Sequence, residues 1–295
     1  MDIAFVILHY MAIEETNRCI EYIRKNIDTK NYKIIVVDNA SPNGSGKDIS
    51  QKYKEDKDVT VILNSNNLGF AKGNNVGFKY AAEMWNPEYV ILLNNDVYLL
   101  EKNLKEKLDK EYEDNKFAVL GPLIMTGDGK CNVNPIRQSL RSRKEIVHQI
   151  KKFERRKKRI KWGVESWYRL LIVTLSSVKK IICGGRNTNK EYLMHKENVQ
   201  LHGCFLVFSQ EYMKVFTGLD DRTFLYGEEE ILYKHLMERK LKSVYSPDVL
   251  VYHQEDAATD MVIKQEKEKT LFCIDNNIES LKGLLEVYDL YENKR

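Results

Sequence analysis

The stretch Lys33–Asp38, with the sequence KIIVVD, is followed directly by Asn39–Gly44, with the sequence NASPNG. Four consecutive β-branched residues favour a strand that is buried on both faces. Asparagine, serine, proline and glycine together are typical of a turn. We therefore expect a buried strand that ends at Asp38, and the rest of the fold is predicted by how this pattern repeats along the chain.

The same strand pattern occurs at four other places before residue 126, with helical patterns between them. We expect strands at Ala4–His9, Val59–Leu63, Tyr89–Leu93 and Ala118–Met125, and helices at Glu14–Asn26, Asp48–Asp56, Lys72–Met84 and Glu101–Asn115. Alternating strands and helices of this length predict an α/β fold with a mostly parallel central sheet and helices on both faces.

The alternation is interrupted between residues 132 and 194 and then resumes. We expect a strand at Leu201–Ser209, a helix at Glu228–Arg239, strands at Leu241–Tyr245 and Val249–His253, and a helical tail from Asp260. The predicted organisation is two halves of one α/β unit, residues 1–131 and 196–258. A basic, helical insertion at 132–195 separates the halves, and a helical extension at 259–295 follows them.

The composition is that of a folded protein with an uneven distribution of charge. Of the 295 residues, 43% are hydrophobic and 31% are charged, which excludes global disorder. The formal net charge is +4, but residues 137–180 hold fifteen basic and three acidic residues and so carry +12. The rest of the chain therefore carries −8, and this asymmetry bears on the partners of the protein.

The spacing of the cysteines and the lengths of the apolar runs indicate the cellular compartment of the protein. The five cysteines are scattered without a C-x-x-C pair, which is typical of reduced thiols in the cytosol and argues against a zinc site. Asp2 stands where the start of a signal peptide would carry basic residues, so we expect no secretory signal. The apolar run Leu170–Leu175 in the basic segment is far shorter than the ~20 residues that span a bilayer. We expect a cytoplasmic protein.

Polar residues gather at the predicted strand ends, where open α/β sheets bind ligands. Asp38 ends the second strand and Asp96 follows the fourth, although aspartate is also common in ordinary turns. Between them, Asn64–Gly77 holds three glycines and five asparagines around a helix start, so that backbone amides could approach a nucleotide or a phosphate. The stretch is neither a P-loop nor a G-x-G-x-x-G motif.

Five motifs together resemble the family 2 glycosyltransferases, whose GT-A fold is a Rossmann-like domain for nucleotide-sugars. In the order of the family they are Val36–Ser41 (VVDNAS), Asn66–Gly77 (NNLGFAKGNNVG), Leu92–Asp96 (LLNND), Gly218–Glu230 (GLDDRTFLYGEEE) and Val251–His253 (VYH). The resemblance is to the rhamnosyltransferase-like branch that builds bacterial surface polysaccharides, and it covers roughly residues 3–255.

The resemblance implies a role for each matching residue. The donor nucleotide-sugar would be bound by Asp38, Asn39, Asn67, Gly69, Gly73, Asn74, Asn94 and Asn95. Asp96 and His253 would hold a divalent cation, Mg²⁺ or Mn²⁺, because hard oxygen ligands favour these ions. Glu229 would be the catalytic base and Glu228 the reserve candidate, since Glu-Glu-Glu stands where the family usually has Glu-Asp.

The basic segment at 137–182 has three interpretations. Basic residues beside Trp162, Trp167 and aliphatic residues suit a helix that lies on an anionic membrane. A polybasic stretch could also bind nucleic acid, but no nucleic-acid module surrounds it, and we expect no nucleic-acid partner. The third interpretation is a solvated helical face.

The function implied by the resemblance is inverting, metal-dependent transfer of one hexosyl or deoxyhexosyl group. The donor would be a nucleoside-diphosphate-sugar, and the acceptor a glycan or lipid-linked glycan for a surface polysaccharide such as capsule or O-antigen. The enzyme would be peripheral to the inner face of the cell membrane. Two alternatives stay open: a sugar nucleotidyltransferase, although His9–Ala12 is no glycine-rich basic loop, and a non-catalytic protein that binds membranes or RNA.

Overall fold

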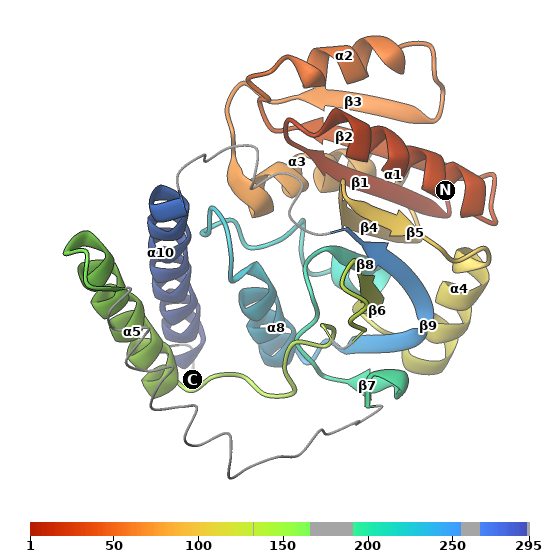
Figure 1. Ribbon diagram of the computed structural model, residues 1–295. Helices are drawn as coiled ribbons and strands as arrows, with labels where there is room; N and C mark the ends of the chain where they lie inside the picture. Colours follow the sequence, from red (N-terminus) through yellow and green to blue (C-terminus); the bar gives the residue numbers. More distant parts are fainter. Residues whose placement is uncertain (132, 166–190, 255–265, 294–295) are drawn as a thin grey trace.

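The computed structural model describes residues 1–131, 133–165, 191–254 and 266–293. Its centre is one nine-stranded sheet in the order β3-β2-β1-β4-β8-β6-β9-β5, with β7 paired to β9 (Figure 1). The strands are β1 (Ile3–His9), β2 (Tyr32–Asp38), β3 (Val59–Leu63), β4 (Tyr89–Asn94), β5 (Val97–Leu99), β6 (Val119–Thr126), β7 (Lys196–Glu197), β8 (Phe205–Ser209) and β9 (Ser243–His253).

Helices cover both faces of this sheet, as predicted. They are α1 (Ile13–Asn26), α2 (Ser45–Lys52), α3 (Gly69–Trp85), α4 (Leu104–Asn115), α7 (Gln210–Met213) and α8 (Glu228–Arg239). Ile20 of α1, Ile49 of α2 and Leu108 of α4 belong to the core on one face. Phe78 of α3 and Leu232 of α8 belong to the core on the other. Burial on both faces explains why β1, β2 and β4 are nearly continuous apolar runs.

The first four strands of the sheet are parallel. β1 pairs with β2 and β4, and β2 pairs with β3, all in parallel. The pairing places His9 opposite Asp38, so the carboxyl ends of β1 and β2 lie side by side. β6 and β9 are also parallel, whereas β8 runs antiparallel between β4 and β6. The polar residues that follow β2 and β4 therefore share one edge of the sheet.

Several details differ from the sequence-based prediction: β8 begins at Phe205 rather than Leu201, and the short elements β7 and α7 were not predicted. The two strands expected at Leu241–Tyr245 and Val249–His253 form one strand, β9, whose pairing with β6 shifts after Ser246. Pro247 lacks a backbone N–H, and a bulge is where a strand tolerates such a residue. The short strand β5 was not predicted, because three residues are too few for a periodic pattern.

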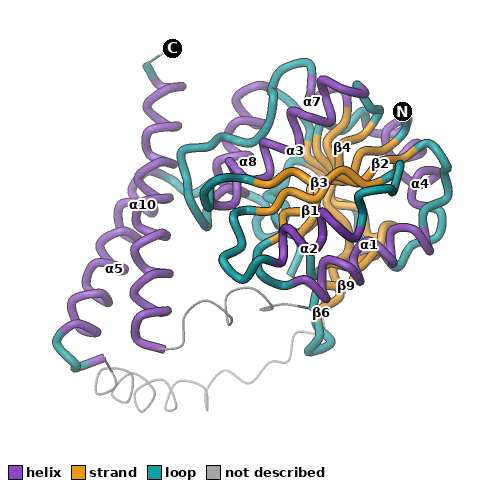
Figure 2. Tube along the Cα trace, turned by 90° about the horizontal axis from the view of Figure 1, so that it is seen from above, coloured by secondary structure: helices purple, strands orange, loops and turns teal. Residues whose placement is uncertain are grey.

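Two long helices stand away from the sheet, and we call them the arm: α5 (Arg143–Lys161) and α10 (Glu266–Glu292). Figures 1 and 2 show them side by side. α5 begins with a capping box between Ser142 and Glu145. The apolar residues Ile146, Ile150, Phe153 and Ile160 of α5 pack against Ile274, Ile278, Leu281 and Leu284 of α10.

The arm is attached to the sheet domain through α8. The ammonium group of Lys234 lies 4.1 Å from the centre of the Tyr288 ring, and His235 Nδ1 lies 2.8 Å from the Tyr291 hydroxyl oxygen. The helix predicted within the basic segment is therefore present as α5, and residues 166–182 of that segment lie outside the described residues. Across the described residues, no helix combines the length and the apolar character needed to cross a bilayer.

Candidate active site

Asp38 is buried at the carboxyl end of β2, where the sequence places it. The Ser41 hydroxyl donates to Asp38 Oδ1 at 2.5 Å, and the Ser41 N–H donates to the same oxygen at 3.2 Å. A Cβ on Gly46 would collide with the Asp38 carboxylate, so only glycine fits there. The turn after β2 therefore holds the carboxylate in one orientation at the strand end.

His9 lies beside Asp38 and was not among the predicted site residues. Its Nε2 lies 4.0 Å from Asp38 Oδ1, and its ring nitrogens bond Thr16 Oγ1 at 2.7 Å and Ser45 Oγ at 2.8 Å. Burial lowers the pKa of His9 to about 4, against the opposing effect of the Asp38 charge, so the ring is neutral at pH 7. Its position at the end of the first strand was the signal that could have found it.

Asn39 and Asn67 connect the end of β2 to the asparagine-rich loop. Asn39 Nδ2 donates to Asn67 Oδ1 at 2.9 Å and to the Gly69 carbonyl oxygen at 3.0 Å. Asn39 Oδ1 accepts the Leu68 N–H at 2.9 Å. These side-chain atoms thus make hydrogen bonds within the protein, and the two residues shape the loop.

The glycines of this loop allow close approaches of backbone. Gly69 has φ +77, and a Cβ on it would collide with the Phe224 carbonyl oxygen. A Cβ on Gly73 would lie 2.7 Å from Leu8 Cδ1, so Gly73 lets α3 pack onto β1. Asn74 donates to the Phe70 carbonyl oxygen at 3.0 Å, while its buried Oδ1 makes no hydrogen bond with the described residues.

Asp96 and His253 come together, as the sequence predicts. His253 Nε2 lies 3.4 Å from Asp96 Oδ1, because Val97 of β5 pairs with His253 of β9. Both residues are buried, and neither Asp96 Oδ1 nor His253 Nδ1 makes a hydrogen bond with the described residues. Asn95 points away and donates to the Ala12 carbonyl oxygen at 3.2 Å. Buried oxygen and nitrogen atoms that make no hydrogen bond are suited to bind a cation, so Asp96 and His253 fit a metal site.

The three glutamates at the start of α8 have three different environments. Burial raises the pKa of Glu228 to about 7, with a further contribution from the charge of Glu229, and Glu228 Oε1 makes no hydrogen bond with the described residues. Burial also raises the pKa of Glu229, whose carboxylate packs against Gly203. Glu230 is 2% exposed and forms an ion pair with Arg141, whose Nε lies 2.8 and 2.9 Å from the two carboxylate oxygens.

The tripeptide His202–Cys204 joins these groups, and the motifs did not predict it. The His202 ring centre lies 5.9 Å from that of His253, and burial lowers the pKa of His202 to about 4, with a smaller contribution from His253. A Cβ on Gly203 would lie 2.8 Å from Glu229 Oε1, and the Cys204 carbonyl oxygen accepts the Asn94 N–H at 3.0 Å. The Asp96–His253 pair and the start of α8 are therefore parts of one site.

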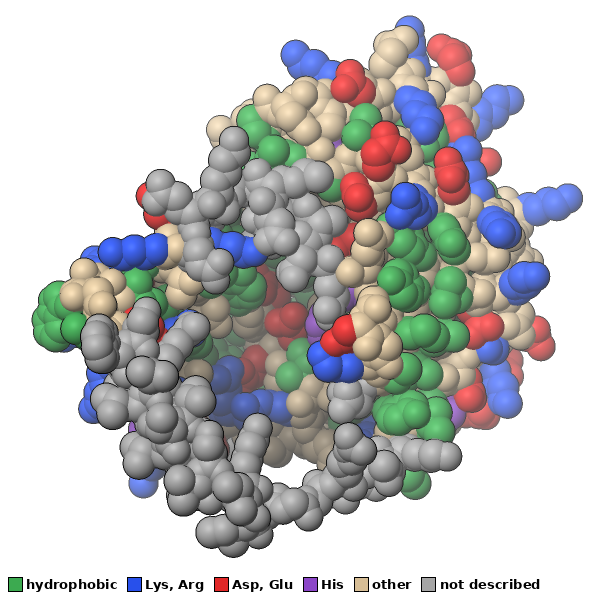
Figure 3. Space-filling model, in the orientation of Figure 1, with side chains coloured by type: hydrophobic (Ala, Val, Ile, Leu, Met, Phe, Trp, Pro, Cys, Tyr) green, Lys and Arg blue, Asp and Glu red, His purple; other side chains and the backbone are tan. Residues whose placement is uncertain are grey.

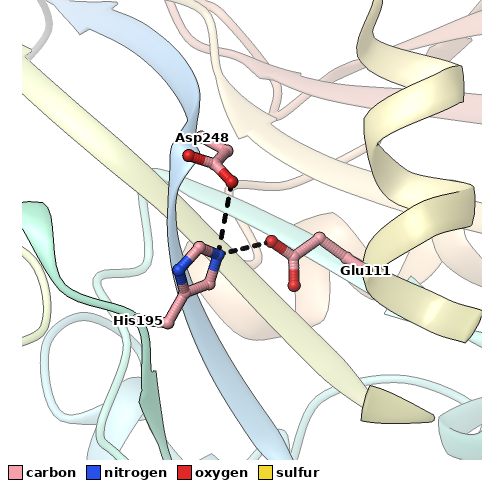
Figure 4. A group of neighbouring side chains, drawn as sticks. All are labelled: Glu111, His195 and Asp248. Atoms are coloured by element: carbon pink, nitrogen blue, oxygen red, sulfur yellow. Dashed lines mark hydrogen bonds and ion pairs between the residues drawn. The ribbon is translucent and has the colours of Figure 1, made fainter. Parts of the chain in front are cut away.

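A second group of possible metal ligands lies beside the middle of β9, where Asp248 follows the irregularity in the strand (Figure 4). His195 Nε2 lies 2.7 Å from Glu111 Oε1 and 3.5 Å from Asp248 Oδ2. The ligand atoms of the three residues lie within 4.8 Å of one another, so the group could hold a metal ion. Glu111 is buried, and Asp248 and His195 are more exposed.

Comparison with known proteins gives one family. The model of that family, described as glycosyl transferase family 2, matches residues 4–172. The chain is 25% identical over 128 residues to the low-salt glycan biosynthesis hexosyltransferase Agl10 of Haloferax volcanii. The matched stretch covers 43% of this chain and 38% of Agl10, so it spans about two fifths of that relative.

The solved structures that resemble this fold include S. aureus TarS. TarS 1–349 in complex with UDP has a TM-score of 0.52 and 12% sequence identity, with 93% of this chain and 65% of that chain covered. TarS 1–349 alone has a TM-score of 0.51 and 10% identity, with coverage of 96% and 71%. At these identities the likeness concerns the fold, and it confirms the predicted GT-A sheet with its mostly parallel centre.

Proposed function

Because the chain belongs to glycosyl transferase family 2, we propose that it transfers one sugar from a nucleoside-diphosphate-sugar to a glycan acceptor with inversion. The observation that carries the proposal is the buried Asp96–His253 pair, whose unbonded polar atoms lie at the same edge of the sheet as Asp38. Family membership favours transfer over the two alternatives, a nucleotidyltransferase and a non-catalytic binding protein.

We propose that Asp38 contacts the nucleoside part of the sugar donor. Its carboxylate is fixed by Ser41 and would accept hydrogen bonds from the base or the ribose. The UDP complex of TarS, which has a similar fold, supports a nucleoside diphosphate as the donor's leaving group. Asn39, Asn67, Gly69 and Gly73 act indirectly in this proposal, since they shape the loop beside Asp38, and Asn74 and Asn94 stay candidate donor contacts.

The metal is proposed to be Mg²⁺ or Mn²⁺, held by Asp96 and His253. The fit rests on two observations: Asp96 Oδ1 lies 3.4 Å from His253 Nε2, and neither Asp96 Oδ1 nor His253 Nδ1, the other ring nitrogen, makes a hydrogen bond with the described residues. When bound, such a cation would neutralise the charge that grows on the departing diphosphate. Asn95 fixes the turn behind Asp96, because its side chain is bonded to Ala12 and Thr16.

The base is proposed to be Glu229, with Glu228 as the alternative. A base works best when its pKa lies near the working pH, and burial raises the pKa of both carboxyls. Glu230 is unsuitable because Arg141 holds both of its oxygens. The base would take the proton of the acceptor hydroxyl as that oxygen attacks the anomeric carbon from the side opposite the diphosphate.

We also propose that the enzyme acts at the inner face of an anionic membrane on a lipid-linked precursor of a surface polysaccharide. The support is the net charge of +12 on residues 137–180. Because α10 covers the apolar face of α5, contact would be made by the basic face of α5 rather than by inserted apolar residues. In this division of the chain, residues 1–131 bind the donor, 132–195 and 259–295 form the membrane-proximal part, and 196–258 serve the acceptor.

Calorimetry with UDP as the probe tests the donor and metal parts of the proposal. We expect UDP to bind in the presence of Mn²⁺, to bind more weakly in EDTA, and to lose this metal dependence in Asp96→Asn. Binding that is equally strong with and without the cation would overturn the metal part. If UDP, GDP and dTDP all fail to bind with Mn²⁺ present, the donor part is wrong.

A further inference from the structure

A cavity of about 180 Å³ lies between the start of α8 and the arm. Gln200 and Glu229 line it from the sheet domain, and Gln149, Phe153 and Asn277 line it from the arm. Figure 3 shows the hollow between these two parts of the molecule. The cavity has room for several water molecules and thus for one sugar ring. The candidate base therefore lies on one side of the cavity, and residues of the arm form the opposite side.

Gln200 is one of the residues that line this cavity, and its side-chain oxygen is buried without a hydrogen-bond partner among the described residues. The residue is 6% exposed, and its Oε1 makes no hydrogen bond with the described residues. Its backbone is fixed, because its N–H donates to the Arg137 carbonyl oxygen at 2.8 Å and its carbonyl oxygen accepts the Ile136 N–H at 2.8 Å. A buried amide oxygen loses its hydration without compensation unless a ligand supplies a donor.

The lining favours an uncharged, hydroxyl-rich ligand. The amides of Gln149, Gln200 and Asn277 can each donate and accept hydrogen bonds, which suits hydroxyl groups. Phe153 adds an apolar surface for the C–H face of a ring. The charge of Glu229 would repel a phosphate or a carboxylate, since the neighbouring Arg141 is already paired with Glu230. An anionic headgroup therefore fits this cavity poorly.

We propose that the cavity is the acceptor subsite and that it binds one uncharged sugar residue of the acceptor glycan. This inference rests on the proposed transferase function. The acceptor hydroxyl gives its proton to the Glu229 carboxylate, and its oxygen forms the new bond to the anomeric carbon. The bond from that carbon to the diphosphate oxygen breaks, and the diphosphate leaves with the electron pair.

α10 supplies a matched pair of residues for the test. Asn276 Nδ2 donates to the Phe272 carbonyl oxygen at 2.9 Å, and Asn277 Nδ2 donates to the Cys273 carbonyl oxygen at 2.8 Å. The two side chains thus make the same local bond, and of the two only Asn277 lines the cavity. Asn277→Ala and Asn276→Ala should therefore affect the helix equally and the acceptor unequally.

The experiment uses methyl hexopyranosides as neutral acceptors and the matching sugar phosphates and uronic acids as anionic ones. Binding is followed by saturation-transfer NMR, and donor cleavage is followed by UDP release with Mn²⁺. We expect neutral glycosides to bind and anionic ones not to bind. Asn277→Ala and Gln200→Leu should weaken neutral binding about tenfold, the worth of one hydrogen bond. Asn276→Ala should not, and UDP affinity should stay unchanged in all three variants.

The outcomes separate this inference from the function on which it rests. If UDP binds and is released normally while Asn277→Ala and Gln200→Leu bind glycosides like the wild type, the cavity is not the acceptor subsite. If the anionic sugars bind preferentially, or if no sugar binds, the proposal that the cavity takes an uncharged sugar is wrong. If the wild type binds none of UDP, GDP and dTDP and cleaves no donor carrying them, the proposed transferase function is contradicted instead.

Discussion

β9 takes part in two histidine–carboxylate groups, one at its carboxyl end and one beside its middle, and the two groups differ in how their polar atoms are hydrogen-bonded. At the carboxyl end, His253 Nε2 lies 3.4 Å from Asp96 Oδ1. There, Asp96 Oδ1 and His253 Nδ1 are buried and make no hydrogen bonds with the described residues. These atoms therefore have no partner among the described residues, which fits a ligand that would complete the group.

In the group beside the middle of β9, Glu111 has hydrogen-bond partners among the described residues. Its Oε1 accepts the Ser246 hydroxyl at 2.6 Å and lies 2.7 Å from His195 Nε2. Its Oε2 accepts the Asn115 amide at 2.9 Å. These contacts tie α4 to β9 and to the chain just before β7, so this group holds the fold together without an ion.

The difference between the two groups indicates where a ligand would bind in this molecule. A buried polar atom without a partner costs about 1–3 kcal/mol, so a fold keeps one where a ligand completes it. By that criterion we propose that the Asp96–His253 group binds the ligand and that the Glu111 group is structural, although the geometry of the Glu111 group could accept a metal ion. The predictions below would sharpen this distinction or break it.

The largest expected effect comes from Asp96→Asn, which keeps the shape of the side chain and removes its charge. Transfer should fall by about 10³-fold or more, because the charge growing on the diphosphate would lose its cation. Sugar transfer is measured with Mn²⁺ present, and circular dichroism checks the fold. Glu111→Gln, in the group beside the middle of β9, is the matched control and should stay active. Full activity of Asp96→Asn would contradict the assignment of the Asp96–His253 group as the binding site.

The next effect concerns the acidic pair at the start of α8. Glu229→Gln should lower turnover by about 10²–10⁴-fold, because the proton acceptor is removed while UDP affinity persists. Turnover and calorimetric UDP binding are measured for Glu229→Gln and Glu228→Gln in parallel. An active Glu229→Gln beside a dead Glu228→Gln would move the base by one residue. If both variants turn over normally, the pair serves only to begin the helix.

The strand ends could be predicted from the sequence, because β-branched runs and turn residues are local signals. The end of β2 at Asp38 illustrates this success, whereas the pairing of Asp96 with His253 was implied by the family resemblance rather than by a local signal. The environment of Glu230 could not be predicted, since its partner Arg141 lies 89 residues away in the basic segment. Hydrophobic periodicity says which face of a helix is buried but not which distant residue covers it.

His202 and Gln200 were missed for a related reason. Neither belongs to a periodic pattern or to a family motif, and each matters because of where the chain passes after the insertion. Likewise, the antiparallel direction of β8 depends on the long connection before it, which no local signal encodes. Contacts between residues far apart in the sequence were thus the feature of the site that could not be predicted from the sequence.

A further effect is the pH dependence of stability due to Glu228. Its pKa is about 7 in the folded protein and near the model-peptide value of about 4.5 when unfolded, so folding favours the protonated form. Stability should therefore fall as the pH rises from 4.5 to 7, by up to about 3 kcal/mol. Urea unfolding at pH 5 and pH 8 measures it. Glu228→Gln should gain stability relative to the wild type at pH 8, whereas the exposed Glu113→Gln should not.

A smaller effect separates paired from exposed basic residues on α5. Lys157 pairs with Asp275, and Arg156 and Arg159 pair with Glu165. Changing the exposed residues Lys151, Lys152 and Arg155 to Gln should thus weaken sedimentation with anionic vesicles more than changing the paired set Arg156, Lys157 and Arg159. Each basic residue near such a surface is worth about 1 kcal/mol. Equal sedimentation of both triple variants and the wild type would contradict the membrane proposal.

The smallest expected effect concerns His195. His195→Ala removes one partner of Glu111 and should lower stability by about 1 kcal/mol while leaving kcat/KM unchanged. Thermal unfolding with Zn²⁺ decides whether the Glu111 group is only structural, because a metal at 100 times its Kd would add about 2.7 kcal/mol. The background for this titration is Asp96→Asn, which removes the other site. We expect no stabilisation by Zn²⁺ in that background. Stabilisation that persists in Asp96→Asn and disappears in Asp96→Asn/His195→Ala would show that a hydrogen-bonded group binds metal here, and hydrogen-bond satisfaction would then not distinguish the two groups beside β9.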